Sequence, residues 1–353
     1  MSLNLPSKPT VKLPEVLAKL PKAELHLHLE GSIEPATVVE LAARHGVRVG
    51  VEAAEARYSY ADFPGFLDAF KWVSSFVRTP GDYVLIAEHL ADRLIEQRVV
   101  YAEITLSVGV MLLREQNPDD NLAALDAFAR RAFRHGLIIR WVIDAVRQFG
   151  TGAAMEVARW AARCRKQGVA AFGMGGDELA LPAEEFRSVY DFARSEGLHC
   201  LVHAGEVGGP KAVRDAVEVL GAERVGHGIA ASTDPALMAL LAERQIPLEI
   251  CPTSNLRTGA LARLLAKPSA EIEEHPVRLL HERGVPVTIS SDDPAMFRTS
   301  LLAEYALLPR LGFTPAEIAR VARRSIEAAF AEDATKEALL HSFDDVAGAF
   351  GLV

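Results

Sequence analysis

Hydrophobic residues along the chain gather in eight short runs, separated by stretches with helical periodicity. The runs are rich in Val, Ile, Leu and Ala, and they are almost continuously apolar instead of alternating with polar residues. Continuous apolar runs of this length are typical of parallel β-strands covered by helices on both faces. We therefore predict strands at Ala23–Leu29, Val99–Leu106, Leu137–Ala145, Val169–Gly173, Leu198–His203, Arg224–Gly228, Ile246–Cys251 and Val285–Ser290.

The stretches between these runs predict helices, because several of them begin or end with residues that favour helix termini. Asp234 followed by Pro235 is a start signal, and glycines such as Gly46 and Gly136 are stop signals. Eight strands alternating with helices favour a (β/α)8 TIM barrel, in one domain over residues 1–353. An open doubly wound sheet is the alternative, although such a sheet needs no eighth strand. The predicted helices include Pro35–His45, Ala123–His135, Ala154–Gln167, Glu184–Glu196, Val213–Leu220 and Pro235–Arg244.

The longest stretch without a predicted strand is residues 47–98, which follow the first strand. Its portion Tyr58–Val77 carries aromatic residues at roughly helical spacing. An insertion after a barrel strand faces the end of the barrel where active sites lie. Two interpretations stay open: a pair of extra helices packed on the barrel rim, or a lid over the barrel mouth.

Seven ionisable side chains fall at the C-terminal ends of predicted strands, the position of active sites in this fold. The first strand ends in H-L-H-L-E-G, and His26 and His28 point to the same side because alternate residues of a strand share a face. Two imidazoles so arranged form half of a metal site, although a pair of core histidines has the same spacing. The other candidates are His203 and Glu206 near the end of the fifth strand, His227 in the sixth, and Asp292 and Asp293 after the eighth.

These residue types together predict metal-assisted hydrolysis. Three neutral imidazoles and one carboxylate suit a zinc-like divalent ion, and such a metal lowers the pKa of water toward about 7. Glu206 then serves as general acid and base, while His227 and Asp293 orient the water. The Asp-Asp-Pro sequence at 292–294 is also good turn chemistry, and the two interpretations are compatible. Many two-metal hydrolases of this architecture need a modified lysine at the fourth strand to bridge their two ions. Here the fourth strand ends without a lysine, which favours one metal ion over two.

The amino-acid composition and net charge limit the class of protein and the binding partners that are compatible with this chain. The 353 residues are 50% hydrophobic and 24% charged, which supports a large core and excludes disordered and fibrous classes. With 38 basic and 47 acidic residues the net charge is −9, which disfavours nucleic acid and anionic membrane surfaces as partners. Cys164, Cys200 and Cys251 are too far apart for a thiolate zinc site. Because neither a signal-peptide pattern nor a membrane-length apolar run is present, we expect a cytoplasmic protein.

Four motifs in this order resemble the adenosine deaminase family of the amidohydrolase superfamily. They are H-L-H at 26–28, V-H-A-G-E at 202–206, G-H-G at 226–228 and S-D-D-P at 291–294. The likeness runs from about residue 20 to residue 308, and G-D-E at 176–178 and C-P-T-S-N at 251–255 are similar as well. The resemblance implies hydrolytic deamination of a 6-aminopurine, with one zinc ion held by His26, His28, His203 and Asp292.

The same resemblance implies roles for the remaining candidates. Glu206 protonates purine N1, and His227 and Asp293 hold the attacking hydroxide. The backbone N–H of Gly176 binds purine N3, and Asp293 also meets N7. His28 and Glu30 complete the substrate contacts that the resemblance implies.

The seven other histidines lie in or next to predicted helices or at a strand start, and we expect them to be solvated or helix-terminal: His45, His89, His135, His199, His275, His281 and His341.

Glu30 makes the substrate class the open question. Adenosine deaminases carry Asp at this position, where it contacts the ribose 5′-hydroxyl, whereas H-L-H-L-E-G is similar to adenine deaminases. The G-D-E and G-H-G strands resemble those of nucleoside deaminases. The sequence F-G-M-G-G at 172–176 and the stretch 246–255 resemble those of enzymes that deaminate 6-aminodeoxyfutalosine. This compound is an adenosine analogue enlarged at the 5′ end. We expect a purine nucleoside substrate, adenosine or a 5′-modified adenosine, converted to the 6-oxo product and ammonia; free adenine is the alternative.

Overall fold

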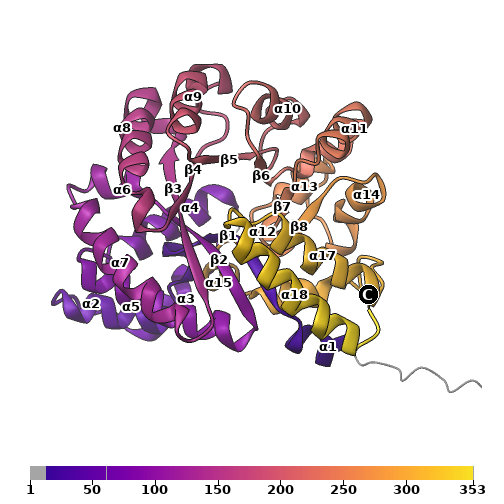
Figure 1. The fold of residues 1–353 in the computed structure, drawn as a ribbon. Helices are drawn as coiled ribbons and strands as arrows, with labels where there is room; N and C mark the ends of the chain where they lie inside the picture. The colour runs from indigo at the N-terminus through magenta and orange to yellow at the C-terminus, as the bar shows by residue number, and fades with distance from the viewer. Residues whose placement is uncertain (1–12, 61, 353) are drawn as a thin grey trace, which may run out of the picture.

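A computed structural model describes residues 13–60 and 62–352, with eight parallel strands at the centre and helices around them (Figure 1). The strands are hydrogen-bonded in chain order from β1 to β8, and a bridge between Leu27 and Asp292 joins the last strand to the first. This arrangement confirms the predicted (β/α)8 barrel. The strands are β1 (Lys22–His28), β2 (Val99–Leu106), β3 (Ile138–Val146), β4 (Val169–Gly175), β5 (His199–Ala204), β6 (Arg224–His227), β7 (Leu248–Ile250) and β8 (Val287–Ile289).

Helices alternate with these strands along the chain. Asp234 begins α11 as predicted, because its side chain accepts hydrogen bonds from the N–H groups of Ala236 and Leu237. The helices are α1 (Leu13–Lys19), α2 (Pro35–Arg44), α3 (Val51–Arg57), α4 (Phe63–Ser74), α5 (Pro80–Glu96), α6 (Val108–Leu113), α7 (Pro118–Phe133), α8 (Gly150–Arg163), α9 (Arg187–Ser195), α10 (Pro210–Glu218), α11 (Pro235–Arg244), α12 (Pro252–Arg257), α13 (Ala260–Leu264), α14 (Val277–Glu282), α15 (Pro294–Phe297), α16 (Leu301–Leu307), α17 (Pro315–Glu327) and α18 (Asp333–Ala349).

The last two strands are shorter than the hydrophobic pattern predicts. β7 begins directly after Pro247 and β8 directly after Pro286, whereas the apolar runs begin earlier. Proline has no backbone N–H to give to a neighbouring strand, so it is tolerated at the start of a strand and not within it. The positions of the strand ends, which carry the site, are little affected.

The barrel interior is filled differently at its two ends. Near the N-terminal ends of the strands, Val142, Ala171 and Leu201 pack with Phe330 in a small apolar cluster. The larger core lies between the strands and the surrounding helices. The ionisable side chains of the site occupy the opposite end, which we call the mouth, and this is the end where barrel enzymes build their active sites.

The 47–98 segment contains three helices, α3, α4 and α5, whereas one of the two interpretations left open was a pair of helices on the barrel rim. α4 is fixed to the barrel at both ends: Tyr60 donates a hydrogen bond to the Met296 carbonyl at 2.7 Å, and Arg114 donates to the Ser74 carbonyl at 2.6 Å. Phe66 of α4 also stacks on Phe297, with ring centroids 5.0 Å apart. The segment therefore lies against the barrel mouth, and motion of a lid stays a prediction.

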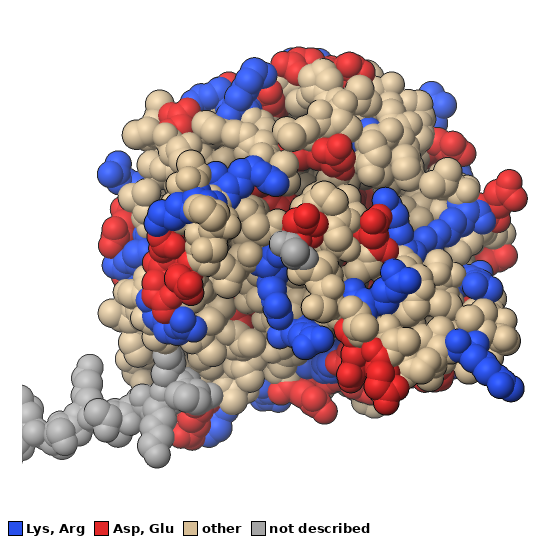
Figure 2. All heavy atoms as spheres, turned by 180° about the vertical axis from the view of Figure 1, so that it is seen from behind, with Lys and Arg blue, Asp and Glu red and all other residues tan. Residues whose placement is uncertain are grey.

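The surface on one side of the molecule carries charges of both signs. On the face drawn in Figure 2, acidic and basic side chains of the described residues lie close together among uncharged ones. Within residues 13–60 and 62–352, no helix is both long and apolar enough to cross a membrane.

Candidate metal-dependent active site

Three strand ends bring His26, His28, His203 and Asp292 together at the mouth, and we call these four residues the mouth cluster. Their candidate ligand atoms all lie within 4.8 Å of one another. His28 Nε2 lies 3.3 Å from His203 Nε2, and Asp292 Oδ1 lies 3.4 Å from His26 Nε2 and 3.5 Å from His28 Nε2. These separations are close to the edge, about 3.3 Å, of a tetrahedron whose ligands lie about 2.0 Å from a central zinc ion.

The hydrogen bonds of the mouth cluster leave lone pairs directed toward its centre. His26 Nε2 is buried and has no hydrogen-bond partner among the described residues. Its other ring nitrogen, Nδ1, lies 2.8 Å from Glu249 Oε2, and His203 Nδ1 lies 3.2 Å from the Met174 carbonyl. Outer acceptors of this kind hold the proton on Nδ1 and free Nε2 for a metal. An unpaired buried nitrogen is costly, so the cluster fits a divalent ion on its own chemistry.

The chain closes the barrel through the same residues. The Asp292 N–H donates to the His26 carbonyl at 3.0 Å, and the His28 N–H donates to the Asp292 carbonyl at 2.9 Å. The strand pairing that completes the barrel therefore also sets the separation of three candidate ligands. Gly226 of β6 is required by close packing, because a Cβ atom there would lie 2.8 Å from His26 Cε1.

Glu206 lies over the mouth cluster with the properties of a proton donor. Its Oε2 lies 3.5 Å from His227 Nε2, and its Oε1 lies 3.1 Å from the hydroxyl of Thr258. Burial, reinforced by the negative charges of Asp292 and Glu178, raises its pKa to about 8. Glu206 is therefore mostly protonated at neutral pH, as a general acid must be.

Asp293 is another carboxyl group at the mouth cluster, and one of its oxygen atoms is unpaired. It is buried, and its Oδ1 has no hydrogen-bond partner within the part of the chain that the structure describes. Burial and the neighbouring charge of Asp292 raise its pKa well above the usual range for an aspartate. Gly31 makes room for it, since a Cβ atom at position 31 would collide with the Asp293 carboxyl group.

A cavity of about 300 Å³ opens from these residues to the surface. α4 lines this cavity with the apolar side chains of Phe63, Phe66, Leu67 and Phe70 and with the basic side chain of Lys71. Of the predicted site residues, those that line the cavity are His28, Gly176, His203, Glu206, His227, Asp292 and Asp293. His26 lies beneath them within the mouth cluster.

Glu30 has a different position from that of the other predicted substrate contacts. It is buried, its Oε1 accepts a hydrogen bond from the Ser107 N–H at 3.3 Å, and Ser107 in turn lines the cavity. Burial raises the pKa of Glu30 to about 7. The structure thus places Glu30 behind the cavity wall at Ser107.

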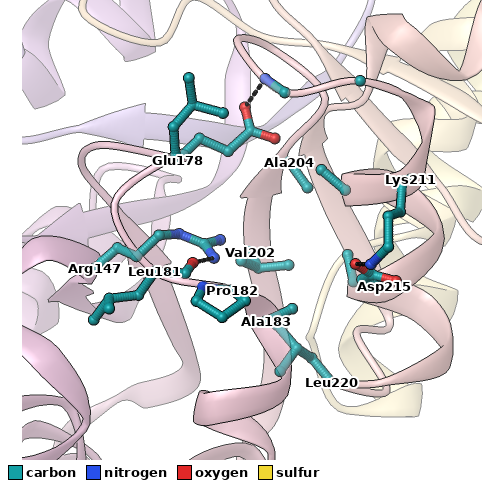
Figure 3. Close-up of a pocket in the computed structure, with 15 residues that line it drawn as sticks. Arg147, Glu178, Leu181, Pro182, Ala183, Val202, Ala204, Lys211, Asp215 and Leu220 are labelled. Carbon is teal, nitrogen blue, oxygen red and sulfur yellow. Dashed lines mark hydrogen bonds and ion pairs between the residues drawn. The ribbon is translucent and has the colours of Figure 1, made fainter.

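Glu178, which the sequence singled out only within the G-D-E motif, holds the loop that carries Glu206. Its two carboxylate oxygens accept hydrogen bonds from the N–H groups of Gly205, Val207 at 2.8 Å and Gly208 at 2.9 Å. Figure 3 shows this carboxylate directed at the loop, above a second cavity of about 240 Å³ that Arg147 and Lys211 also line. Glu178 therefore connects the end of β4, near Gly176, with the loop after β5.

Sequence reasoning also missed Asp144, which lines the main cavity. Burial raises its pKa to about 8, and its Oδ1 has no partner among the described residues. Asp144 lies near the C-terminal end of β3, so the rule that identified the other strand-end residues would have found it.

Among the other histidines, His275 is helix-terminal, which is one of the two expected positions, but it is not solvated. It follows the 3-10 helix Ile272–Glu274 and precedes α14, and it is 4% exposed. Its Nε2 lies 3.1 Å from Asn255 Oδ1, and Asn255 Nδ2 lies 3.1 Å from His227 Nδ1.

Arg224 is another buried group that sequence reasoning did not identify. It lies between Glu103 and Glu249, and we call these three residues the inner ion-pair cluster.

A (β/α)8 barrel with such a cluster and a protonated acid at its mouth defines a metal-dependent hydrolase. The model of the adenosine deaminase family matches residues 21–346, and the chain belongs to that family of deaminases. It is 40% identical to an aminodeoxyfutalosine deaminase of Streptomyces coelicolor, over 95% of this chain and 86% of the relative. It is 36% identical to an adenine deaminase of Sinorhizobium medicae, over 92% of this chain and 98% of the relative.

Solved structures include a similar fold with metal bound. A zinc-bound amidohydrolase from Burkholderia ambifaria superimposes with a TM-score of 0.85 and 26% identity, over 98% of each chain. The family and the site together assign deamination of adenine-type substrates to this chain.

Proposed function

We propose that this protein is a zinc-dependent deaminase of a purine nucleoside with an enlarged 5′ group, such as 6-aminodeoxyfutalosine. One zinc ion per chain is held by His26, His28, His203 and Asp292. When bound, the ion supplies a water molecule that is nucleophilic at neutral pH. The separations within the mouth cluster and the zinc in the Burkholderia ambifaria relative support this assignment.

In the proposed reaction, water adds to purine C6 and the 6-amino group leaves as ammonia, so that a 6-oxopurine remains. Glu206 gives its proton to N1 while the C6–O bond forms, and its raised pKa supports this role. His227 and Asp293 hold the attacking water, and the Gly176 N–H binds N3. All of these residues line one cavity.

The proposal of a 5′-modified substrate rests on the apolar side chains that line this cavity in addition to the catalytic groups. Besides the catalytic groups and the apolar side chains of α4, the cavity is lined by Leu113 and Phe149, which are 67% and 36% exposed, and by the basic Lys71 and Arg114. A contiguous apolar patch that stays exposed can be part of a ligand-binding groove. A free base leaves these apolar side chains without a partner, whereas a large 5′ group covers them. The 40% identity to an aminodeoxyfutalosine deaminase supports the same choice.

Free adenine is the second candidate, because Glu30 stands in an H-L-H-L-E-G motif and an adenine deaminase is 36% identical. In the structure one oxygen of the Glu30 carboxyl group accepts a hydrogen bond from the Ser107 N–H at 3.3 Å, and the other, Oε2, has no hydrogen-bond partner among the described residues. Glu30 itself does not line the cavity, whereas Ser107 does.

The test is ammonia release by the zinc-loaded protein on 6-aminodeoxyfutalosine, adenosine and adenine. The Glu206→Gln variant, which should retain its metal, serves as the blank. We expect the highest kcat/KM for 6-aminodeoxyfutalosine. Preference for adenosine would remove the 5′ part of the proposal, and preference for adenine would establish the alternative.

A further inference from the structure

A chain of hydrogen bonds runs from the backbone of α14 to His227 in the active site. It begins at the Val277 N–H, which lies 3.2 Å from His275 Nδ1. It continues from His275 Nε2 to Asn255 Oδ1 at 3.1 Å, and from Asn255 Nδ2 to His227 Nδ1 at 3.1 Å. Asn255 and His275 are both buried, and neither lines the substrate cavity.

The direction of every bond in this chain follows from its first donor. A backbone N–H can only donate, so His275 Nδ1 must accept and carries no proton. A ring with one unprotonated nitrogen carries its proton on the other, and burial, which lowers the pKa of His275 to about 3, keeps the ring neutral. His275 Nε2–H therefore donates to Asn255, which presents its carbonyl oxygen. The amide group of Asn255 is thereby oriented with its NH₂ toward His227.

The same logic fixes the tautomer of His227. Because Asn255 Nδ2 is a donor, His227 Nδ1 must be the acceptor, and the ring proton resides on Nε2. Nε2 is the atom that faces the site, 3.5 Å from Glu206 Oε2 and 3.8 Å from Asp292 Oδ2. A nitrogen that already carries a proton can donate a hydrogen bond but cannot take a second proton while the ring stays neutral.

We infer that Asn255 and His275 are positioning residues that hold His227 as an Nε2–H donor. His227 then stabilises the negative charge that develops on the attacking oxygen, and it does not act as the base that deprotonates water. The inference rests on the proposed function, since it specifies the role of His227 in that reaction. It leaves the proton of the attacking water to a carboxylate, and Glu206, which lines the same cavity, becomes one once it has given its proton to N1.

The decisive variant is Asn255→Asp, because it keeps the shape of the side chain and replaces the NH₂ donor with an acceptor. An acceptor at this place requires a proton on His227 Nδ1, which reverses the tautomer. The matched control is His275→Gln, whose amide can still donate to Asn255 Oδ1. His275→Phe removes that donor without adding charge, and it serves if the Asp variant does not fold.

The first readout is independent of catalysis. Two-bond ¹H–¹⁵N spectra of the ¹⁵N-labelled, zinc-loaded protein report which ring nitrogen of His227 carries the proton, with His227→Gln to assign its signals. We expect Nε2 to be protonated in the wild type and in His275→Gln, and a proton on Nδ1 in Asn255→Asp. A proton on Nδ1 in the wild type would overturn the inference, whatever the substrate proves to be.

The second readout is kinetic, on the best substrate of the ammonia assay. Loss of one preorganised donor to a developing oxyanion costs about 10²–10³ in kcat. We expect this loss in kcat for Asn255→Asp with a smaller change in KM, and near wild-type kcat for His275→Gln. A proton on Nδ1 together with unchanged kcat in Asn255→Asp would refute the role as a donor.

Discussion

Two clusters of buried charge occupy the same barrel, and they differ in how completely their atoms are paired. In the inner ion-pair cluster, Arg224 donates from Nε to Glu249 at 2.6 Å, from Nη2 to Glu103, and from Nη1 to the Ala328 carbonyl at 2.7 Å. Glu103 also accepts a hydrogen bond from the Tyr101 hydroxyl at 3.0 Å. In the mouth cluster, His26 Nε2 has no hydrogen-bond partner within the described residues, and its contact with Asp292 Oδ1 is 3.4 Å long.

Burial and charge by themselves therefore do not mark a catalytic site. Both clusters are largely buried, and both combine acidic with basic groups. The mouth cluster and the residues over it leave atoms such as His26 Nε2 and Asp293 Oδ1 free for a metal and a substrate, whereas the inner cluster has none free among its described atoms. Glu249 joins the two, since one of its oxygens binds Arg224 and the other binds His26. The inner cluster therefore supports the orientation of a proposed metal ligand.

The largest contrast is expected from two histidines of the same strand. His203→Asn removes a proposed ligand, so bound metal and ammonia release should fall by more than the 10–100-fold typical of losing an outer partner. His199→Asn is the control, because His199 is 46% exposed and pairs with Glu223. It should change activity by roughly twofold or less, as surface substitutions usually do. Metal content and turnover measured together test both, and equal metal content in the two variants would contradict the assigned ligand.

The inner cluster should matter mainly for stability. Arg224→Met leaves two buried carboxylates without their partner, which typically costs about 3–5 kcal/mol of the free energy of unfolding. Arg310→Met breaks the exposed pair with Glu273 and should cost about 1 kcal/mol or less. Denaturant unfolding of both variants provides the measurement. Similar losses would show that burial of the inner cluster has no energetic consequence.

Glu178→Gln should show whether Glu178 acts by positioning the loop that carries Glu206. The amide can accept fewer of the three backbone N–H groups around Glu206, so the loop loses its fixed position and kcat falls by up to about 10². Asp177→Asn is the matched control next to it in the chain, where the side chain binds only the Leu179 N–H among the described donors. Metal content should stay constant in both variants. A kcat for Glu178→Gln equal to that of the control would exclude the positioning role.

The smallest effect concerns the pH profile. Glu206 must be protonated to act as an acid, and burial raises its pKa to about 8, so kcat should decline as pH rises through about 8. The Thr258 hydroxyl lowers this pKa by hydrogen bonding, so Thr258→Val should move the decline to slightly higher pH. Rates measured across pH 6–10 give both midpoints. A shift to lower pH in the variant would contradict the assignment of the decline to Glu206.

The hydrophobic pattern of the chain by itself determined the barrel and the end of it that holds the chemistry. Each strand is a local apolar run, and a residue at the end of a strand is assigned by its neighbours in sequence. This local rule is enough to identify His26, His28, His203, Glu206, His227, Asp292 and Asp293 as site candidates. The strand limits at Pro247 and Pro286 are local as well, because proline lacks the N–H that a ladder needs.

Only the tertiary structure decided which groups stand behind those residues. His275 is 48 positions from His227, and Asn255 joins them through contacts that no local pattern records. The same is true of Arg224 with Glu103, 121 positions apart, and of Glu178 beneath the Glu206 loop. Hydrogen bonds are directional and short, so their partners depend on how distant segments pack. The chain order of apolar residues fixes the architecture, whereas the proton positions and charge partners of the site exist only once the barrel has closed.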